Sequence, residues 1–217
     1  MKSILRRVHA HRSVEVFTIR LVLPCVRWSM RVPLLEGIVY RFYERMALAL
    51  VAQLDSGTIL SALGALESEG IDYYLAGGFG IDALVGTVSR FHGDLDIVLD
   101  RYAEQVETAI AVIERHGFHQ IEPHPNLMWM TATAVLVDGD GRMIELVALD
   151  AGRVVAASKT LGNGAVIRDL EGVTSSGEIF GKAVRCLSLP AQLVLQRGKP
   201  LRPKDLHNMR RIAKMGR

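Results

Sequence analysis

The sequence predicts an α/β (α+β) fold in which helices flank one small mixed β-sheet, and three observations support this prediction. The chain has 217 residues, which suits one compact core with a small helical appendage. Apolar residues make up 49% of the chain and charged residues 23%, as in an ordinary globular protein. Stretches with apolar residues at helical spacing alternate with short β-rich runs, and glycines or Asp-Gly turns separate them.

Each element is predicted from its own periodicity and end signals. The first helix follows a capping residue, Asp55 or Ser56, and ends at Gly70. The DGDG run at 138–141 predicts a hairpin turn, and the Gly-, Ser- and Thr-rich stretch 150–183 is expected to loop across one face. In chain order, the expected helices are 55–69, 79–85, 102–116, 189–195 and 205–214, and the expected strands are 71–76, 94–99, 118–122, 127–137 and 142–149.

Composition and charge exclude several classes of protein. Two cysteines, Cys25 and Cys186, are too few for a disulfide scaffold or a cysteine-rich zinc site, and they fit a cytoplasmic location. The net charge is +3, but residues 1–45 carry nine Lys and Arg against three acids, and the rest carries 17 against 20. The body is therefore not a basic groove, and we expect no nucleic-acid partner. No apolar run approaches the roughly 18 residues of a spanning helix, so no membrane partner is expected.

Residues 1–45 are predicted to be a basic leader outside the catalytic domain. Arginine and proline interrupt its apolar residues, which does not fit the core of a signal peptide. We interpret Met46 as the native start of translation, with a loosely attached basic arm as the alternative. The expected domain organisation is then a catalytic domain at 46–187 and a C-terminal helical segment at 188–217.

The residues from Leu75 to Leu99 carry the strongest chemical signal. Gly77 and Gly78 follow a predicted strand and precede a helix, so that backbone N–H groups can approach an anion closely. A bulky side chain at Gly78 is expected to weaken nucleotide binding and to leave the fold largely intact.

Two carboxylates follow on the next predicted strand. Asp94 and Asp96 are two residues apart, so both project from one face of the sheet. Paired carboxylates repel each other unless a cation lies between them, and Mg²⁺ suits such an oxygen-only site. A glycine turn beside a paired-carboxylate magnesium site is typical of phosphoryl or nucleotidyl transfer. The alternative is a surface loop with two solvated acids.

Glu145 is the candidate third carboxylate. It lies between Ile144 and Leu146 in a predicted strand, where burying an acid is costly unless it has a partner or a function. The alternative is a solvent-facing position on an edge strand. Asp138 and Asp140 are better explained as turn residues.

The pattern GGFGIDALVG…SRFHGDLDI resembles the nucleotidyltransferase signature of the polymerase-β-like superfamily. More narrowly, it resembles bacterial aminoglycoside 2″-adenylyltransferases and lincosamide nucleotidyltransferases, which share GG(W/F)(G/A)(I/V)D…G…TR.H.D(I/L)DI. The resemblance covers roughly 58–212 and implies a polymerase-β-like fold with short C-terminal helices. Ser89 stands where the family has Thr, Asn208 replaces an acid, and no histidine follows Glu145.

The resemblance implies a reaction and its co-substrates. A nucleoside monophosphate, most simply AMP, would move from Mg²⁺-bound NTP, most simply ATP, to a hydroxyl of a small molecule such as an aminoglycoside or a lincosamide antibiotic. Gly77 and Gly78 would hold the triphosphate, and Asp94 and Asp96 would ligate the metal. Glu145 would be the third ligand or the general base.

Further residues take roles by the same resemblance. Arg90 would neutralise phosphate charge, with a surface salt bridge as the alternative. Asp82 would orient the loop or a metal-bound water, or simply be solvated on its helix. His92 would brace the loop by a hydrogen bond or contact the ligand, and Lys204 would reach the base or acceptor or begin a solvated helix.

Two other functions fit the same residues. One is a protein-modifying nucleotidyltransferase of a toxin–antitoxin pair. The other is a catalytically inactive nucleotide-binding module, which the retained Asp94 and Asp96 argue against. The oligomeric state is left open by the sequence.

Overall fold

The computed structural model describes residues 53–88, 90, 92–121, 132–150, 153–156, 165–166, 170–196 and 203–215. The leader 1–45 and the start proposed at Met46 lie outside these residues. The helices are α4 (Ser56–Ser68), α5 (Gly77–Val85), α6 (Tyr102–Arg115), α7 (Leu170–Val173), α8 (Leu189–Gln196) and α9 (Pro203–Met215). The strands are β1 (Tyr73–Ala76), β2 (Asp94–Leu99), β3 (Phe118–Ile121), β4 (Ala132–Asp138), β5 (Met143–Asp150), β6 (Arg153–Ala156), β7 (Ala165–Val166), β8 (Thr174–Ile179) and β9 (Lys182–Leu187).

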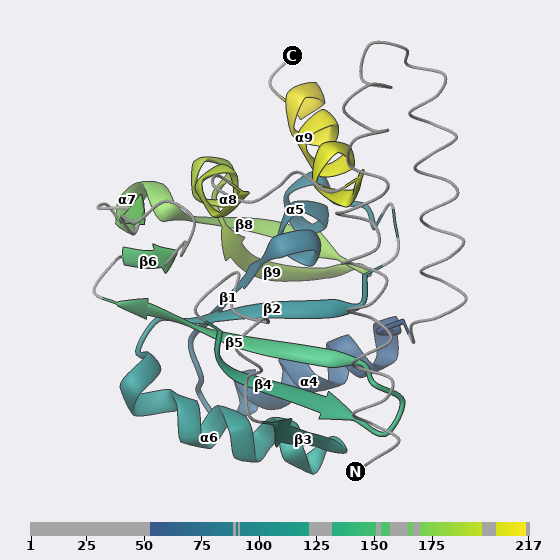
Figure 1. Cartoon of the computed structure of the whole chain (residues 1–217), viewed down its shortest axis with the longest axis vertical. Helices are drawn as coiled ribbons and strands as arrows, with labels where there is room; N and C mark the ends of the chain where they lie inside the picture. The colour runs from purple at the N-terminus through teal and green to yellow at the C-terminus, as the bar shows by residue number, and fades with distance from the viewer. Residues whose placement is uncertain are drawn as a thin grey trace.

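One mixed sheet organises the described part of the chain, in the order β3-β4-β5-β2-β1-β9-β8. The inner pairs β2–β5 and β1–β9 are parallel, and β1–β2, β4–β5 and β8–β9 are antiparallel. Figure 1 shows the strands following one another from β8, beside α8, to β3, beside α6. This is the flanked mixed sheet that the sequence predicts.

The main core covers one face of this sheet. Leu75, Ile97 and Leu146 point from β1, β2 and β5 into a buried cluster with Leu63 of α4 and Ile113 of α6. Because side chains alternate along a strand, the next residues face the other way. There a smaller cluster joins sheet residues such as Val98 and Val147 to Ala191 of α8. Asp94, Asp96 and Glu145 share the strand parity of this second face.

The largest difference from the sequence prediction lies within 150–183. The predicted loop contains the strands β6, β7 and β8, the short helix α7 and the start of β9. The β8–β9 hairpin turns through Phe180 and Gly181, both with positive φ. An Asn-Gly or Asp-Gly pair is the common sequence for such a turn, so Phe-Gly gave no hairpin signal.

The helix cap and the hairpin turn that the sequence predicts are both present in the structure. Asp55 is the N-cap of α4 and accepts a 2.8 Å hydrogen bond from the backbone N–H of Thr58. The turn after Asp138 joins β4 to β5, with Asp138 accepting hydrogen bonds from Asp140 and Arg142. No helix in the described residues has the length and apolar character needed to cross a membrane.

Candidate active site

The glycine turn connects β1 directly to α5, which begins at Gly77 rather than at the predicted residue 79. Gly77 has φ +59°, in the left-handed region that favours glycine. A Cβ at this position would lie 1.7 Å from Oδ2 of Asp96. The Asp96 carboxylate therefore lies directly against the turn, with no room for any side chain at Gly77.

Gly78 packs against the side chains of His92 and Arg90. A Cβ there would lie 2.2 Å from Nδ1 of His92 and 2.6 Å from Nη2 of Arg90. The imidazole is only 3% exposed, so it cannot simply swing away. A valine at Gly78 would therefore have to displace a buried side chain, which weighs against the expectation that a bulky residue there leaves the fold largely intact.

The three candidate carboxylates lie on one face of neighbouring strands. Asp94 and Asp96 are two residues apart on β2, and Asp96 is the register partner of Glu145 on β5. Parallel neighbours in register project on the same side, with strands about 4.8 Å apart. Because β5 pairs with both β2 and β4, Glu145 lies on an interior strand, and the edge-strand alternative is wrong. Its side chain is half-buried and Asp96 is buried.

The three carboxylates do not form a complete three-ligand metal site. Within the described ranges, no three His, Cys, Asp or Glu side chains gather closely enough to hold a metal ion. The donor chemistry nevertheless suits Mg²⁺, which is commonly held by one or two carboxylates together with substrate phosphate oxygens. Asp94 and Asp96 beside the glycine turn would supply that combination, and the metal-ligand roles of Asp94, Asp96 and Glu145 stay predictions.

Asp82 is the centre of a buried polar network. Its carboxylate has no exposed surface, so the alternative of a solvated helix position is wrong. Oδ2 accepts a hydrogen bond from Nε2 of His92, and Oδ1 pairs with Nη1 of Arg211 from α9. Nη2 of Arg211 also donates to the carbonyl oxygen of Thr87 at 2.6 Å and to its hydroxyl at 2.9 Å. The network therefore joins α5, α9 and the loop before β2.

His92 braces this loop as a neutral side chain. Burial lowers the pKa of His92 to about 4, against the raising effect of the Asp82 hydrogen bond and with a smaller lowering contribution from the Arg90 charge. Because the Asp82 carboxylate accepts, Nε2 carries the proton, and Nδ1 is an acceptor without a hydrogen-bond partner among the described residues. The ring also packs against Phe79, with 4.2 Å between ring centroids. The bracing interpretation holds, and Nδ1 beside Gly78 leaves one position for a ligand or water.

Helix α9 also reaches Arg90. Nε of Arg90 donates to Oδ1 of the buried Asn208 at 3.1 Å. His207, the preceding residue, has a lowered pKa because of burial and the nearby charges of Arg90 and Arg211. Lys204 lies at the start of α9, but its side chain lies outside what the structure describes.

Sequence reasoning missed Arg211 and the contact made by Asn208. In the sequence, Asn208 is notable only because it replaces an acidic residue of the family pattern. Arg211 is the second of two consecutive arginines on an amphipathic helix. Neither has a local signal, because each gains its role from a residue more than 100 positions away.

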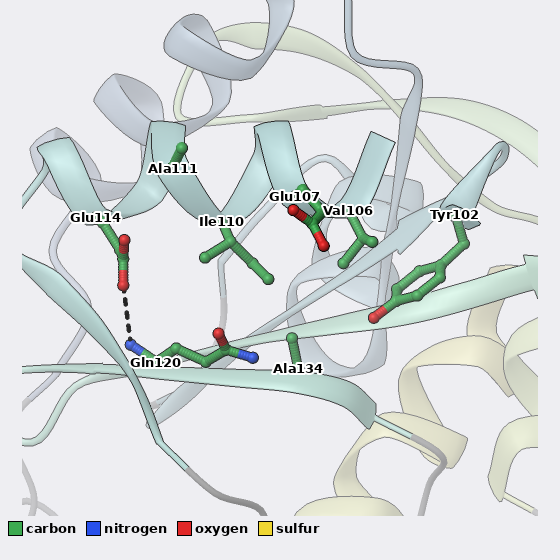
Figure 2. A pocket seen from close by; sticks show the side chains of 8 residues that line it. All are labelled: Tyr102, Val106, Glu107, Ile110, Ala111, Glu114, Gln120 and Ala134. Carbon is green, nitrogen blue, oxygen red and sulfur yellow. Dashed lines mark hydrogen bonds between the residues drawn. The ribbon is translucent and has the colours of Figure 1, made fainter. Parts of the chain in front are cut away.

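A separate hollow lies far from these residues, between α6 and the strands β3 and β4. Its volume is about 400 Å³. Figure 2 shows Glu107 projecting into it between Val106 and Ile110 of α6, and Glu114 accepts a 3.5 Å hydrogen bond from the backbone N–H of Gln120. The residues that line it are Tyr102, Val106, Glu107, Ile110, Ala111, Glu114, Gln120 and Ala134. It holds none of the residues predicted for the active site.

Known structures share this fold. The lincomycin-bound lincosamide antibiotic adenylyltransferase LnuA matches with a TM-score of 0.59 at 23% identity, over 76% of this chain and 99% of that one. The antibiotic-resistance factor ANT(2'')-Ia matches with a TM-score of 0.55 at 19% identity, over 74% of this chain and 83% of that one. The fold is thus that of the nucleotidyltransferases, as the sequence resemblance implies.

Sequence comparison identifies the family. The model of the aminoglycoside-2''-adenylyltransferase family matches residues 58–212, and the chain belongs to this family. A lincosamide resistance protein of Staphylococcus haemolyticus is 27% identical over 153 residues, which are 69% of this chain and 89% of that protein. The protein is accordingly an enzyme, a nucleotidyltransferase.

Proposed function

We propose that this enzyme transfers AMP from Mg²⁺-bound ATP to a hydroxyl group of an antibiotic of the lincosamide or aminoglycoside class. One observation carries the proposal: the Gly77–Gly78 turn lies between the Asp96 carboxylate and the side chains of Arg90 and His92. A triphosphate with its metal needs this combination of backbone N–H groups, cationic side chain and carboxylates.

The nucleotide half of the site is built from α5 and β2. The N-terminus of α5 would receive the β- and γ-phosphates, where the backbone N–H groups and the positive end of the helix favour negative charge. Arg90 would neutralise further phosphate charge. Asp94 and Asp96 would hold Mg²⁺, which when bound offsets phosphate charge and makes the α-phosphorus easier to attack.

Glu145 would act on the acceptor. Its half-buried carboxylate, in register with Asp96, would accept the proton of the acceptor hydroxyl. The hydroxyl oxygen then forms a bond to the α-phosphorus, and the bond between the α-phosphorus and the bridging oxygen breaks. Pyrophosphate leaves with that oxygen, and the acceptor carries AMP.

Two findings support an antibiotic acceptor. The matched family is named for transfer to the 2'' position of aminoglycosides, and the 27% identical relative is a lincosamide resistance protein. Both kinds of molecule offer several hydroxyl groups.

The test is a transfer assay with the full chain, Mg²⁺ and ATP labelled at the α-phosphate. Lincosamides, aminoglycosides and a cell lysate are offered in separate reactions, and label is followed into small molecules and into protein. We expect label on one antibiotic class, release of pyrophosphate, and no transfer by Asp96→Asn. Label on protein alone would favour the protein-modifying alternative. Nucleotide binding without transfer would favour the inactive nucleotide-binding module, and absence of both would refute the proposed function.

A further inference from the structure

The C-terminal helix α9 is connected to the Gly77–Gly78 turn through buried side chains of α5 and of the loop before β2. Arg211 is only 12% exposed at its side chain and pairs with the fully buried Asp82. Asp82 in turn fixes Nε2 of His92, whose ring stands against Gly78. A chain of three buried or nearly buried groups therefore runs from α9 to the turn.

Arg211 is itself fixed at a second point. Its Nη2 donates to the Thr87 carbonyl oxygen and hydroxyl, just beyond the end of α5 at Val85. The guanidinium thus binds the C-terminal end of α5 and the Asp82 carboxylate within it. The planar guanidinium has several N–H donors and can bind both groups at once, whereas a lysine ammonium is a single point charge.

Asn208 provides a parallel connection one helical turn earlier. It is 2% exposed, and its Oδ1 accepts from Nε of Arg90. Arg90 and His92 together form the wall that a Cβ at Gly78 would strike. Asn208 of α9 therefore holds Arg90 directly, and Arg211 of α9 holds His92 through Asp82.

We infer that Arg211 is a positioning residue of the nucleotide site, acting through Asp82 and His92, with Asn208 acting in the same way on Arg90. This inference rests on the proposed function, because it assumes that the wall at Gly78 faces a nucleotide. It assigns α9 to nucleotide binding rather than to the acceptor.

The test compares Arg211→Gln with Arg210→Gln, which removes the same charge from an exposed neighbour on α9. The dissociation constant for Mg²⁺ with a non-hydrolysable ATP analogue is measured without acceptor. We expect about a tenfold increase for Arg211→Gln, partial recovery in Arg211→Lys, and no change for Arg210→Gln. Equal affinity in a folded Arg211→Gln protein would overturn the inference.

A double-mutant cycle separates positioning from general loss of stability. If Arg211 acts through His92, adding Arg211→Gln to a His92→Phe protein should weaken nucleotide binding much less than it does alone. Fully additive losses would show that Arg211 acts by another route and would contradict the inference.

The wild-type protein gives an independent measurement if Arg211→Gln does not fold. Binding is reciprocal, so the nucleotide analogue should slow amide hydrogen exchange in α9 around 208–212. Unchanged exchange in α9 on nucleotide binding would overturn the inference. Failure of the wild-type protein to bind nucleotide at all would instead refute the proposed function.

Discussion

Gly77 is subject to two independent constraints, its backbone conformation and its contact with Asp96. For a residue with a Cβ, adopting the left-handed backbone conformation costs about 1–2 kcal/mol of free energy. At Gly77 that Cβ would in addition collide with the carboxylate that is proposed to hold Mg²⁺. The two effects can be separated with a second glycine, Gly86, which also has positive φ, +74°. Apart from its chain neighbours, no atom of the described residues lies within 4 Å of a Cβ built there.

We expect Gly77→Ala to lower the transfer rate on the order of 10²-fold, the usual effect of displacing a catalytic group by an ångström. Gly86→Ala should lower the melting temperature and leave the transfer rate unchanged. Thermal unfolding and initial rates of both variants check this. If Gly77→Ala retained full activity, the turn would not be part of the active site.

Glu145 is predicted to activate the acceptor rather than to hold the nucleotide. Glu145→Gln should still bind Mg²⁺-ATP but lose on the order of 10²–10⁴ in rate, the usual contribution of a general base. The loss should shrink as pH rises, because the acceptor hydroxyl then needs less help in losing its proton. Loss of nucleotide binding would instead make Glu145 mainly a metal ligand, and unchanged activity would place the third carboxylate elsewhere.

The sequence predicted the residues of the candidate site that lie close together along the chain. Gly77, Gly78, Asp94 and Asp96 belong to one strand–helix–strand unit, so local spacing was enough to place them. Glu145 was found only because an acid between apolar neighbours is unusual. Arg211 could not be found this way, since its partner Asp82 is 129 residues away and no local pattern connects them.

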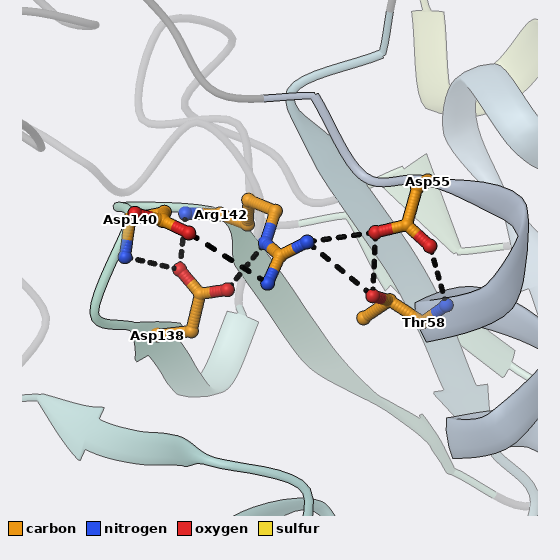
Figure 3. Close-up of polar contacts among 5 residues, drawn as sticks. All are labelled: Asp55, Thr58, Asp138, Asp140 and Arg142. Atoms are coloured by element: carbon orange, nitrogen blue, oxygen red, sulfur yellow. Dashed lines mark hydrogen bonds and ion pairs between the residues drawn. The ribbon is translucent and has the colours of Figure 1, made fainter.

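At the scale of elements, a cluster around Arg142 joins helix α4 to the β4–β5 hairpin. Figure 3 shows its guanidinium between Asp138 and Asp140 of the turn and Asp55 and Thr58 at the start of α4. Nη1 lies 2.7 Å from Oδ2 of Asp55. Asp55 therefore serves both as the helix cap and as one end of this connection.

We expect Asp55→Ala to cost roughly 1 kcal/mol of stability at pH 7, the usual cost of losing an N-cap. Hydrogen bonds from the Thr58 hydroxyl and N–H, opposed by partial burial and assisted by the Arg142 charge, hold the pKa of Asp55 below its ordinary 3.8. A lowered pKa means that this stabilisation is complete above about pH 4 and disappears as pH falls further.

Denaturant unfolding at several pH values checks the prediction, with Asp55→Asn as the control. The amide oxygen can still accept from the Thr58 N–H, so Asp55→Asn should retain most of the cap and show less change near pH 4. An Asp55→Ala protein as stable as wild type would show that neither the cap nor the Arg142 pair contributes.

The β8–β9 hairpin shows why some elements could not be predicted. Its turn residue Phe180 has φ +52°, and Gly177 lies so close to α5 that a Cβ would be 2.3 Å from the Ala83 carbonyl oxygen. Contacts of this kind come from tertiary packing and leave no period in the sequence. By contrast, α4, α6 and the DGDG hairpin carry their own signals and were predicted within a few residues.

At the scale of the whole molecule, the reactivity of the Cys186 thiol shows whether the sheet is intact. It lies on β9 in register with Leu75 of β1 and has no exposed surface. Burial raises the pKa of its thiol to about 11, so very little thiolate exists at neutral pH.

We expect Cys186 to react with a thiol reagent only when β9 opens from β1. The experiment uses a Cys25→Ser protein, so that one thiol remains. Labelling at pH 8 should be slower than that of the unfolded chain by orders of magnitude, and it should accelerate through the unfolding transition. Rapid labelling of the native protein would contradict the packing of β9 against β1.

The central claim is that the Gly77–Gly78 turn and the Asp94–Asp96 pair form one magnesium–nucleotide site. Calorimetric titration of the full chain with α,β-methylene-ATP tests it most directly. Asp96→Asn is compared with Asp100→Asn, which removes the same charge just beyond the far end of β2. We predict that the wild-type protein and Asp100→Asn bind the analogue only when Mg²⁺ is present, and that Asp96→Asn binds it at least about tenfold more weakly, a loss of about 1.4 kcal/mol. Equal binding by Asp96→Asn, or binding by the wild-type protein that is unaffected by chelating the metal, would contradict the claim.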